Sequence, residues 1–237
     1  MSSAIDRNAH VLLVQQAFRS LLDAMARPGE VHELPALDTA ALGLGETGLF
    51  DASVLLAQIV LDPEVSFAVA GEPLETGSET QQADSRARVF LAALPYAPLA
   101  PIDEARFLFV PLACHADVAR RSIEGASAGT FESPHLSATV FVECPRLGEG
   151  EAALDAHVFE LSGPGVDGTA RFSCARDDWA RARAARHDEF PCGVDIVLCD
   201  ELGRIVCVPR SSALRQLDGS AVAADVPSAS TSKGGEL

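Results

Sequence analysis

The segment that most constrains the fold of this chain is residues 190–212, which has the pattern of two strands joined by a tight turn. Residues 194–199 form a short apolar run between turn residues, which is typical of a strand buried on both faces. The polar link 200–203 ends in glycine, and residues 205–208 supply the return strand. Pro209 ends that strand because it has no N–H group to donate. We therefore expect a β-hairpin in the core of the protein.

Asp195 places a carboxylate inside this apolar run. An unpaired buried charge is costly, so the carboxylate needs a cationic partner, and Arg210 just past the return strand is the candidate. Two interpretations follow: a structural ion pair that locks the hairpin, or a site at which an enzyme binds a phosphate-bearing ligand. We favour the structural ion pair.

Length and composition limit both the fold and the classes of partner. The 237 residues are 48% hydrophobic, which is enough for a substantial core, and we expect one α/β domain over residues 1–217. Residues 218–237 are rich in Ala, Ser, Gly and Asp without apolar periodicity, so we expect a disordered tail. The 34 acidic and 18 basic residues give a formal net charge of −16, which disfavours nucleic acid and anionic membrane surfaces as partners.

The N-terminus has no basic start or small-residue cleavage site of the kind found in signal peptides. The longest apolar stretch, residues 54–61, is too short to span a bilayer. Both observations favour a cytoplasmic location.

The sequence offers little support for catalysis or cofactor binding. The only lysine is Lys233, inside the expected tail, so neither Schiff-base chemistry nor a phosphate-cradling P-loop has a lysine on a rigid element. The six cysteines form no CxxC pair, none of the six histidines has a second histidine at ligand spacing, and no Gly-x-Ser-x-Gly motif occurs. We expect no catalytic residue, no cofactor and no metal, and buried cysteines that act as small hydrophobic residues.

Periodicity predicts the remaining elements. Helices are expected at 9–26, 52–61, 79–94, 117–124 and 177–187, and further strands at 31–34, 65–70, 106–112, 137–144 and 157–162. Asn8 and Asp51 are the expected N-caps of the first two helices. In the first helix we expect one apolar stripe to face the core; its members are Val11, Val14, Phe18, Leu21, Leu22 and Met25.

One arginine pattern and one turn have alternative interpretations. Four arginines surround Trp179 in the helix at 177–187, and they form either a solvated basic face or a surface for an acidic partner; they are Arg176, Arg181, Arg183 and Arg186. The turn at 162–165 contains Gly163 and Gly165 on either side of a proline. It is either a structural turn, which we favour, or an anion-binding turn.

Five stretches resemble the PhnH family, a subunit of the bacterial carbon–phosphorus lyase core complex. They occur in the family's order, and they are Phe18-Arg19-x-Leu21-Leu22-x-Ala24-Met25-Ala26-Arg27-Pro28-Gly29, Pro134-His135-x-Ser137-Ala138-Thr139, Leu161-Ser162-Gly163-Pro164-Gly165, Phe190-Pro191-x-Gly193-Val194-Asp195 and Val208-Pro209-Arg210-Ser211. Two departures are small: Ser211-Ser212 stands where the family tends to have threonines, and Cys192 where an aliphatic residue is common.

The resemblance implies a single three-layer α/β domain with a mixed β-sheet, similar to a truncated pyridoxal-phosphate-dependent transferase fold without the cofactor. It also implies a cytoplasmic accessory subunit that acts with sister subunits and forms a homodimer in isolation. The complex of the family helps to couple methylphosphonate to the ribose of a purine nucleoside triphosphate, with displacement of the base. The resemblance carries over no catalytic residue. The alternatives are an enzyme that binds a phosphate ligand with Asp195 and Arg210, and a purely dimeric scaffold protein.

The first of these stretches also suggests where a partner binds. Arg19 and Arg27 lie eight residues apart on the first helix, so they project from similar sides, and Pro28 and Gly29 form the turn that follows. Arginine is favoured at interfaces because its planar group makes bidentate contacts. We expect these four residues to contribute to a subunit interface, although the two arginines could instead only neutralise Asp23 and Glu30.

Overall fold

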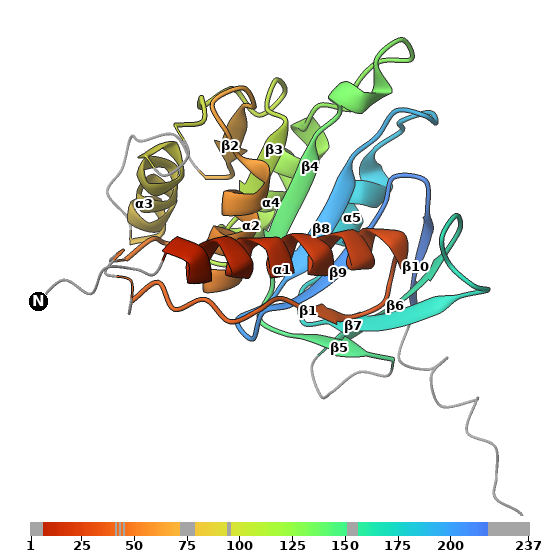
Figure 1. The fold of residues 1–237 in the computed structure, drawn as a ribbon. Helices are drawn as coiled ribbons and strands as arrows, with labels where there is room; N and C mark the ends of the chain where they lie inside the picture. The colour runs from red at the N-terminus through yellow and green to blue at the C-terminus, as the bar shows by residue number, and fades with distance from the viewer. Residues whose placement is uncertain are drawn as a thin grey trace, which may run out of the picture.

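The central sheet of the protein is mixed and has six strands (Figure 1). The structure, a computed structural model, describes residues 7–40, 42, 44, 46–71, 79–93, 96–150 and 156–217; the expected tail at 218–237 and Lys233 lie outside them. The strands occur in the spatial order β1 (His32–Glu33), β9 (Arg204–Val208), β8 (Asp195–Cys199), β4 (Thr139–Glu143), β3 (Phe107–Val110) and β2 (Phe67–Val69). The last four run parallel to one another, whereas β9 is antiparallel to β8 and β1 is antiparallel to β9.

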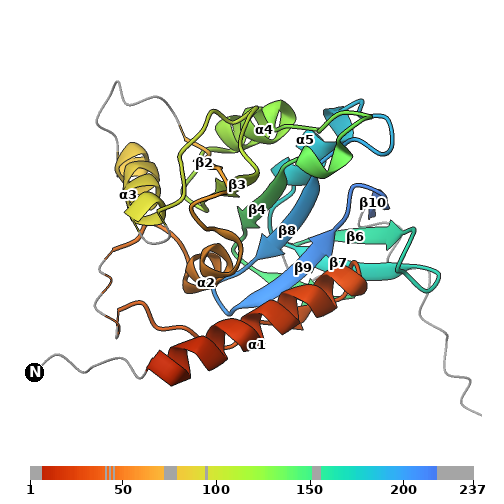
Figure 2. The ribbon, with the colours of Figure 1, turned by 45° about the horizontal axis from the view of Figure 1, so that its top comes forward.

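Helices cover both faces of this sheet, so the predicted three-layer α/β architecture is confirmed for the described residues (Figures 1 and 2). One face carries α1 (Arg7–Ala26), α2 (Asp51–Val60) and α3 (Glu79–Ala93). The other carries α4 (Ala116–Gly125) and α5 (Asp178–Ala185), which pack against each other. All five helices were predicted from periodicity, with ends that differ by one or two residues.

The predicted hairpin is β8 and β9, and it lies in the core. Within β8, Ile196 and Leu198 belong to the hydrophobic cluster under α4 and α5, while Val197 and Cys199 belong to the cluster under α1 and α2. Side chains of a strand alternate between the two faces of its sheet, so this division follows from the apolar run itself. The expectation of a strand buried on both faces is confirmed.

A second sheet was not predicted. It is antiparallel, and its strands occur in the order β10 (Ala213–Leu217), β6 (His157–Ser162), β7 (Ala170–Cys174) and β5 (Leu147–Glu149). Only β6 was expected from the sequence. Phe159 and Phe172 of this sheet stack on each other, and both rings contact Trp179 of α5, which is fully buried. The short helix η1 (Pro134–Leu136) was also missed.

The expected core stripe of α1 is wrong in most of its members. Leu21 is buried and Val14 is half-buried, but the other four side chains are about half exposed: Val11 48%, Phe18 48%, Leu22 47% and Met25 51%. The face that meets the sheet instead contains Ala17, Leu21 and Ala24. Two alanines let the helix axis lie close to its neighbours β9 and α2, and the larger side chains remain on the adjacent outer face.

Neither expected N-cap residue occupies an N-cap position in the structure. Asn8 lies within the first turn of α1, which already includes Arg7. Phe50 occupies the N-cap position of α2, and Asp51 is the first residue of the helix, where its carboxylate accepts a hydrogen bond from the Thr39 hydroxyl.

Two buried carboxylates lie at or just beyond the carboxyl ends of central strands. Glu143 at the end of β4 accepts hydrogen bonds from the backbone N–H of Phe50 at 2.7 Å and of Leu112 at 2.9 Å, so it fixes the start of α2 beside the end of β3. Asp200, in the turn between β8 and β9, accepts from Leu147 N at 3.0 Å and from the Arg204 guanidinium. Asp200 therefore ties the hairpin to the second sheet.

Glu143 should leave a signature in the pH dependence of stability. Burial raises the pKa of its carboxyl above the ordinary value of 4.5, although hydrogen bonds from Ser53, Leu112 and Phe50 oppose that shift. A carboxyl whose pKa is raised on folding binds its proton more tightly in the folded state, so stabilisation present at low pH is lost as pH rises through the raised pKa. Relative to the Glu143→Gln variant, the wild-type free energy of unfolding should fall as pH rises above about 4.5. Urea titrations of both proteins at several pH values measure this difference, and a difference that stays constant or grows with pH would contradict it.

Candidate functional site

Three arginines from two parts of the chain line one small pocket near the start of β8. Its volume is about 180 Å³, and we call it the arginine pocket; its lining residues are Arg183, Arg186, Asp188, Cys192, Gly193, Val194 and Arg210. Arg183 comes from α5, Arg186 follows that helix, and Arg210 follows β9. The site thus forms where α5 and the two ends of the central hairpin meet.

Asp195 and Arg210 form the ion pair that the sequence suggested. The Arg210 guanidinium donates to both carboxylate oxygens of Asp195, and the backbone N–H of Arg210 donates to Asp195 Oδ1 at 2.8 Å. Arg210 Nη1 also donates to the carbonyl of Pro134 at 2.8 Å. Because its oxygens are occupied by a fixed cation and by backbone, Asp195 is suited to hold Arg210 in place rather than to accept a proton from a substrate.

Arg186 and Arg183 differ in what they bind. Arg186 pairs with Asp188 and donates from Nη1 to the carbonyls of Ile123 at 2.6 Å and Glu124 at 2.9 Å. Arg183 donates only to carbonyls, those of Pro209 at 3.1 Å and Ser212 at 2.6 Å, and no carboxylate of the described residues pairs with it. Burial lowers the pKa of the Arg183 guanidinium, with Asp195 acting weakly in the opposite direction.

Of the two interpretations of the four arginines in and around α5, the solvated basic face is wrong for three of them, because only Arg181 is exposed. Arg181 is exposed and pairs with Asp177, but the Arg176 and Arg186 side chains are only 9% and 7% exposed. The sequence did contain an indication that the Arg183 side chain is partly buried. Arg183 lies four residues after the buried Trp179 and therefore on the same side of the helix.

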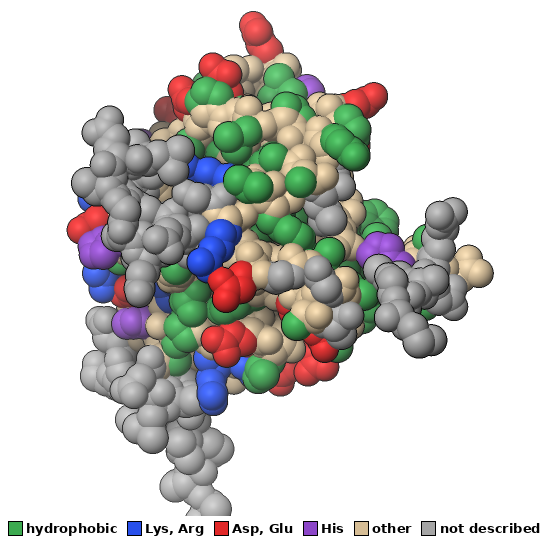
Figure 3. All heavy atoms as spheres, turned by 90° about the vertical axis from the view of Figure 1, so that its left-hand side faces the viewer, with side chains coloured by type: hydrophobic (Ala, Val, Ile, Leu, Met, Phe, Trp, Pro, Cys, Tyr) green, Lys and Arg blue, Asp and Glu red, His purple; other side chains and the backbone are tan. Residues whose placement is uncertain are grey.

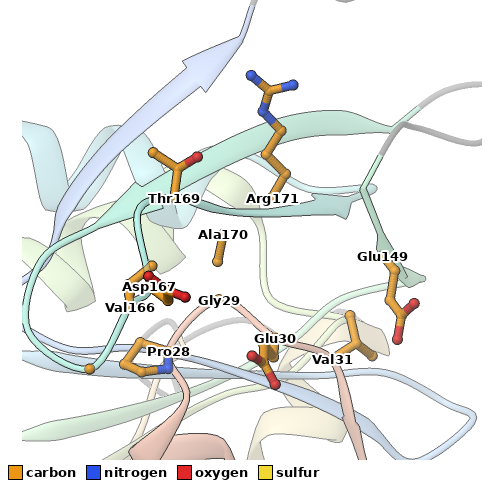
Figure 4. Close-up of a pocket in the computed structure, with 11 residues that line it drawn as sticks. Pro28, Gly29, Glu30, Val31, Glu149, Val166, Asp167, Thr169, Ala170 and Arg171 are labelled. Atoms are coloured by element: carbon orange, nitrogen blue, oxygen red, sulfur yellow. The ribbon is translucent and has the colours of Figure 1, made fainter.

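A larger pocket, of about 400 Å³, lies between the two predicted glycine turns (Figure 4). Pro28 and Gly29 line one side, and Gly165 with the residues after it lines the other. We call it the turn pocket. Three of its charged lining residues are acidic, namely Glu30, Glu149 and Asp167. The fourth, Arg171, points away from the Pro28–Gly29 turn and pairs with Glu160, so the surroundings give no support to an anion at this turn.

The glycines of these turns are required by close packing. Gly29 has φ +81°, and a Cβ there would lie 2.9 Å from the Ala170 Cβ. Gly165 has φ +85°, and its Cβ would lie 3.1 Å from Pro28 Cδ. A larger residue at either position would force the turns apart, so the structure favours the structural interpretation of the 162–165 turn.

The five stretches that carry the family resemblance touch one another in series. The first meets the third where Pro28 packs on Gly165, and the third meets the fifth where Gly163 lies against Ser211 and Ser212. The fifth stretch then reaches the second and the fourth through the Arg210 contacts with Pro134 and Asp195. The spacing of the five stretches along the sequence did not indicate that they are in contact.

Of the four predicted interface residues, only Arg19 and Arg27 are exposed at the surface. Arg27 makes long ion pairs with Asp23 at 3.8 Å and Glu30 at 3.5 Å, as the alternative interpretation expected. Arg19 is exposed and has no ion pair among the described residues. Pro28 and Gly29 are buried in this single chain, so only the arginines are free to meet a partner.

The cysteines are free thiols, and five of the six are buried, as predicted; they are Cys114, Cys144, Cys174, Cys199 and Cys207. Burial raises the pKa of Cys207 to about 12 and also raises that of Cys144. Within the part of the chain that the structure describes, no group of three or more His, Cys, Asp or Glu side chains could hold a metal ion. None of the described helices has the length and apolar character needed to cross a bilayer.

Comparison with known proteins agrees with the resemblance. The family model described as bacterial phosphonate metabolism protein (PhnH) matches residues 7–215. A protein of Stutzerimonas stutzeri described as putative C-P lyase subunit protein HtxG is 28% identical over 200 residues, which are 84% of this chain and 84% of that protein.

One thiol should react much faster than the others in the native protein. Cys192 is only half-buried in the arginine pocket, whereas the other five thiols are buried and out of reach of a reagent in the native protein. With N-ethylmaleimide we expect one rapid adduct by mass spectrometry, absent in Cys192→Ser, and six adducts after denaturation. Two or more rapid adducts on the native wild type would show that the buried thiols are accessible.

Proposed function

Because this chain belongs to the PhnH family, bacterial phosphonate metabolism proteins, we propose that it is an accessory subunit of a carbon–phosphorus lyase complex. The observation that carries this proposal is the family match over residues 7–215, which includes every helix and nearly every strand described. The relative described as a putative C-P lyase subunit supports the same role.

Within that complex, we place this chain in the coupling of methylphosphonate to the ribose of a purine nucleoside triphosphate, with the catalytic residues on sister subunits. The occupied Asp195–Arg210 pair supports an accessory role over the alternative of an independent enzyme. The similarity to pyridoxal-phosphate-dependent transferases and the cytoplasmic location stay predictions.

The outer face of α1 is the surface best suited to a partner. Its half-exposed side chains Val11, Phe18, Leu22 and Met25 recur at helical spacing and form one apolar stripe along the helix. Arg19, without an ion pair among the described residues, flanks this stripe. A continuous exposed apolar stripe beside polar residues is characteristic of protein–protein contact sites.

We assign a sister subunit, rather than a second copy of this chain, to the α1 face. Each copy has a formal net charge of −16, so a second copy would add like charge around the apolar stripe. Among the described side chains visible in Figure 3, acidic and basic groups are scattered between hydrophobic ones and form no extended basic patch, which suits contact with protein more than with nucleic acid.

Charged substitutions on the stripe test this assignment. Phe18→Glu with Leu22→Glu places two carboxylates where a partner would bury apolar surface, so co-purification with co-expressed sister subunits should be lost while circular dichroism stays unchanged. Leu202→Glu, at an exposed position in the β8–β9 turn, is the matched control and should assemble normally. Arg19→Ala with Arg27→Ala should weaken assembly less, because exposed ion pairs contribute little.

Size-exclusion chromatography with mass determination separates the remaining outcomes. Assembly that survives the Phe18→Glu, Leu22→Glu change would exclude the α1 face as the site of contact. Absence of any complex with the wild-type chain would contradict the subunit role itself. The same measurement on the isolated chain tests the predicted homodimer.

A further inference from the structure

We propose that the arginine pocket binds a small tetrahedral oxyanion of the phosphate or phosphonate class. The proposal concerns this chain alone, and it does not depend on the role of the chain in a lyase complex. It rests on the charge, rigidity and size of the pocket.

The charge around the pocket is incompletely balanced. Arg186 has Asp188 and Arg210 has Asp195, but Arg183 has only the carbonyls of Pro209 and Ser212. Its Nε and Nη1 groups have no hydrogen-bond partner among the described residues. A partly buried cation that no carboxylate contacts directly is stabilised by an anion that enters, and this local excess of arginine lies in a chain of net charge −16.

The guanidinium groups are also held in place before a ligand arrives. Arg186 is anchored by two carbonyls and a carboxylate, and Arg210 by Asp195 and the Pro134 carbonyl. Side chains that are already fixed lose little conformational entropy on binding. The planar guanidinium donates two parallel hydrogen bonds to the oxygens of a phosphoryl group, which makes arginine well suited to this class of anion.

The size of the pocket favours a small ligand. Sites for drug-sized molecules measure roughly 300–1,000 Å³, whereas this pocket measures about 180 Å³, too little for a whole nucleotide. Gly193 keeps the space open, since it has φ +131° and a Cβ there would lie 3.2 Å from the Arg210 Cβ. The larger turn pocket is a poor competitor for anions because three carboxylates line it.

Calorimetry on the full chain at low ionic strength tests the proposal, with inorganic phosphate and methylphosphonate as probes. We expect one site for at least one of them. Arg183→Gln should raise the Kd of the bound probe by about 10- to 100-fold, because this is the effect of losing one hydrogen bond between charged groups. Arg181→Gln is the matched control, because Arg181 lies on the same helix but points to solvent, and its Kd should equal that of the wild type.

Protection of Cys192 gives a second readout that needs no variant. Circular dichroism shows whether Arg183→Gln folds. If it does not fold, the wild-type protein alone still tests the proposal, because an oxyanion in the pocket should slow the reaction of Cys192 with N-ethylmaleimide. The proposal fails if neither probe binds, if Arg183→Gln binds as tightly as the wild type, or if Cys192 reacts at the same rate with and without the bound probe. Binding of ATP without binding of either small anion would also overturn it.

Discussion

The parallel pairing of β4 with β8 is the constraint on which the rest of the structure depends. Thr139 to Glu143 lie in register with Asp195 to Cys199, so two segments more than fifty residues apart in the sequence form the middle of the sheet. Parallel strands are stable only when both faces are covered, and this requirement explains why helices from different parts of the described chain cover the two faces of this sheet. The second sheet and α5 then complete one of these faces through Phe159, Phe172 and Trp179.

The two ends of these central strands have different chemistry. At the carboxyl ends, where open α/β sheets usually bind ligands, Glu143 and Asp200 are buried and bound to backbone N–H groups of neighbouring segments. Polar groups that are fully occupied in this way stabilise the fold and leave little to offer a ligand. At the opposite end, Arg183 retains unused donors beside Arg210. The arginine with unused donors therefore lies at the amino end of β8, opposite the buried carboxylates.

The sequence predicted the elements whose structure is decided by the local pattern of residues. It did not predict the features that are decided by packing between distant segments. The hairpin β8–β9 has an apolar run and turn residues, so it was found, as was the Asp195–Arg210 pair. In contrast, β10 has only one buried side chain, Leu217, and no apolar run marks it. In α1 two adjacent faces are apolar, and periodicity cannot tell that the face with small Ala17 and Ala24 is the one that meets the sheet. The arginine pocket needs residues from α5, the following loop and the end of β9, and their proximity is a property of the fold.

The pairing of β1 with β9 has a consequence for synthesis on the ribosome. Gly29 donates to the Cys207 carbonyl and Leu34 to the Gly203 carbonyl, and α1 packs directly on β9. The N-terminal helix therefore lacks its partner strand β9 until residues 204–208 have left the exit tunnel. During this delay both apolar faces of α1 are open to solvent, and exposed apolar surface of this kind is what chaperones bind in nascent chains. The order of the chain thus delays the native packing of its first helix on the central sheet until β9 has been made.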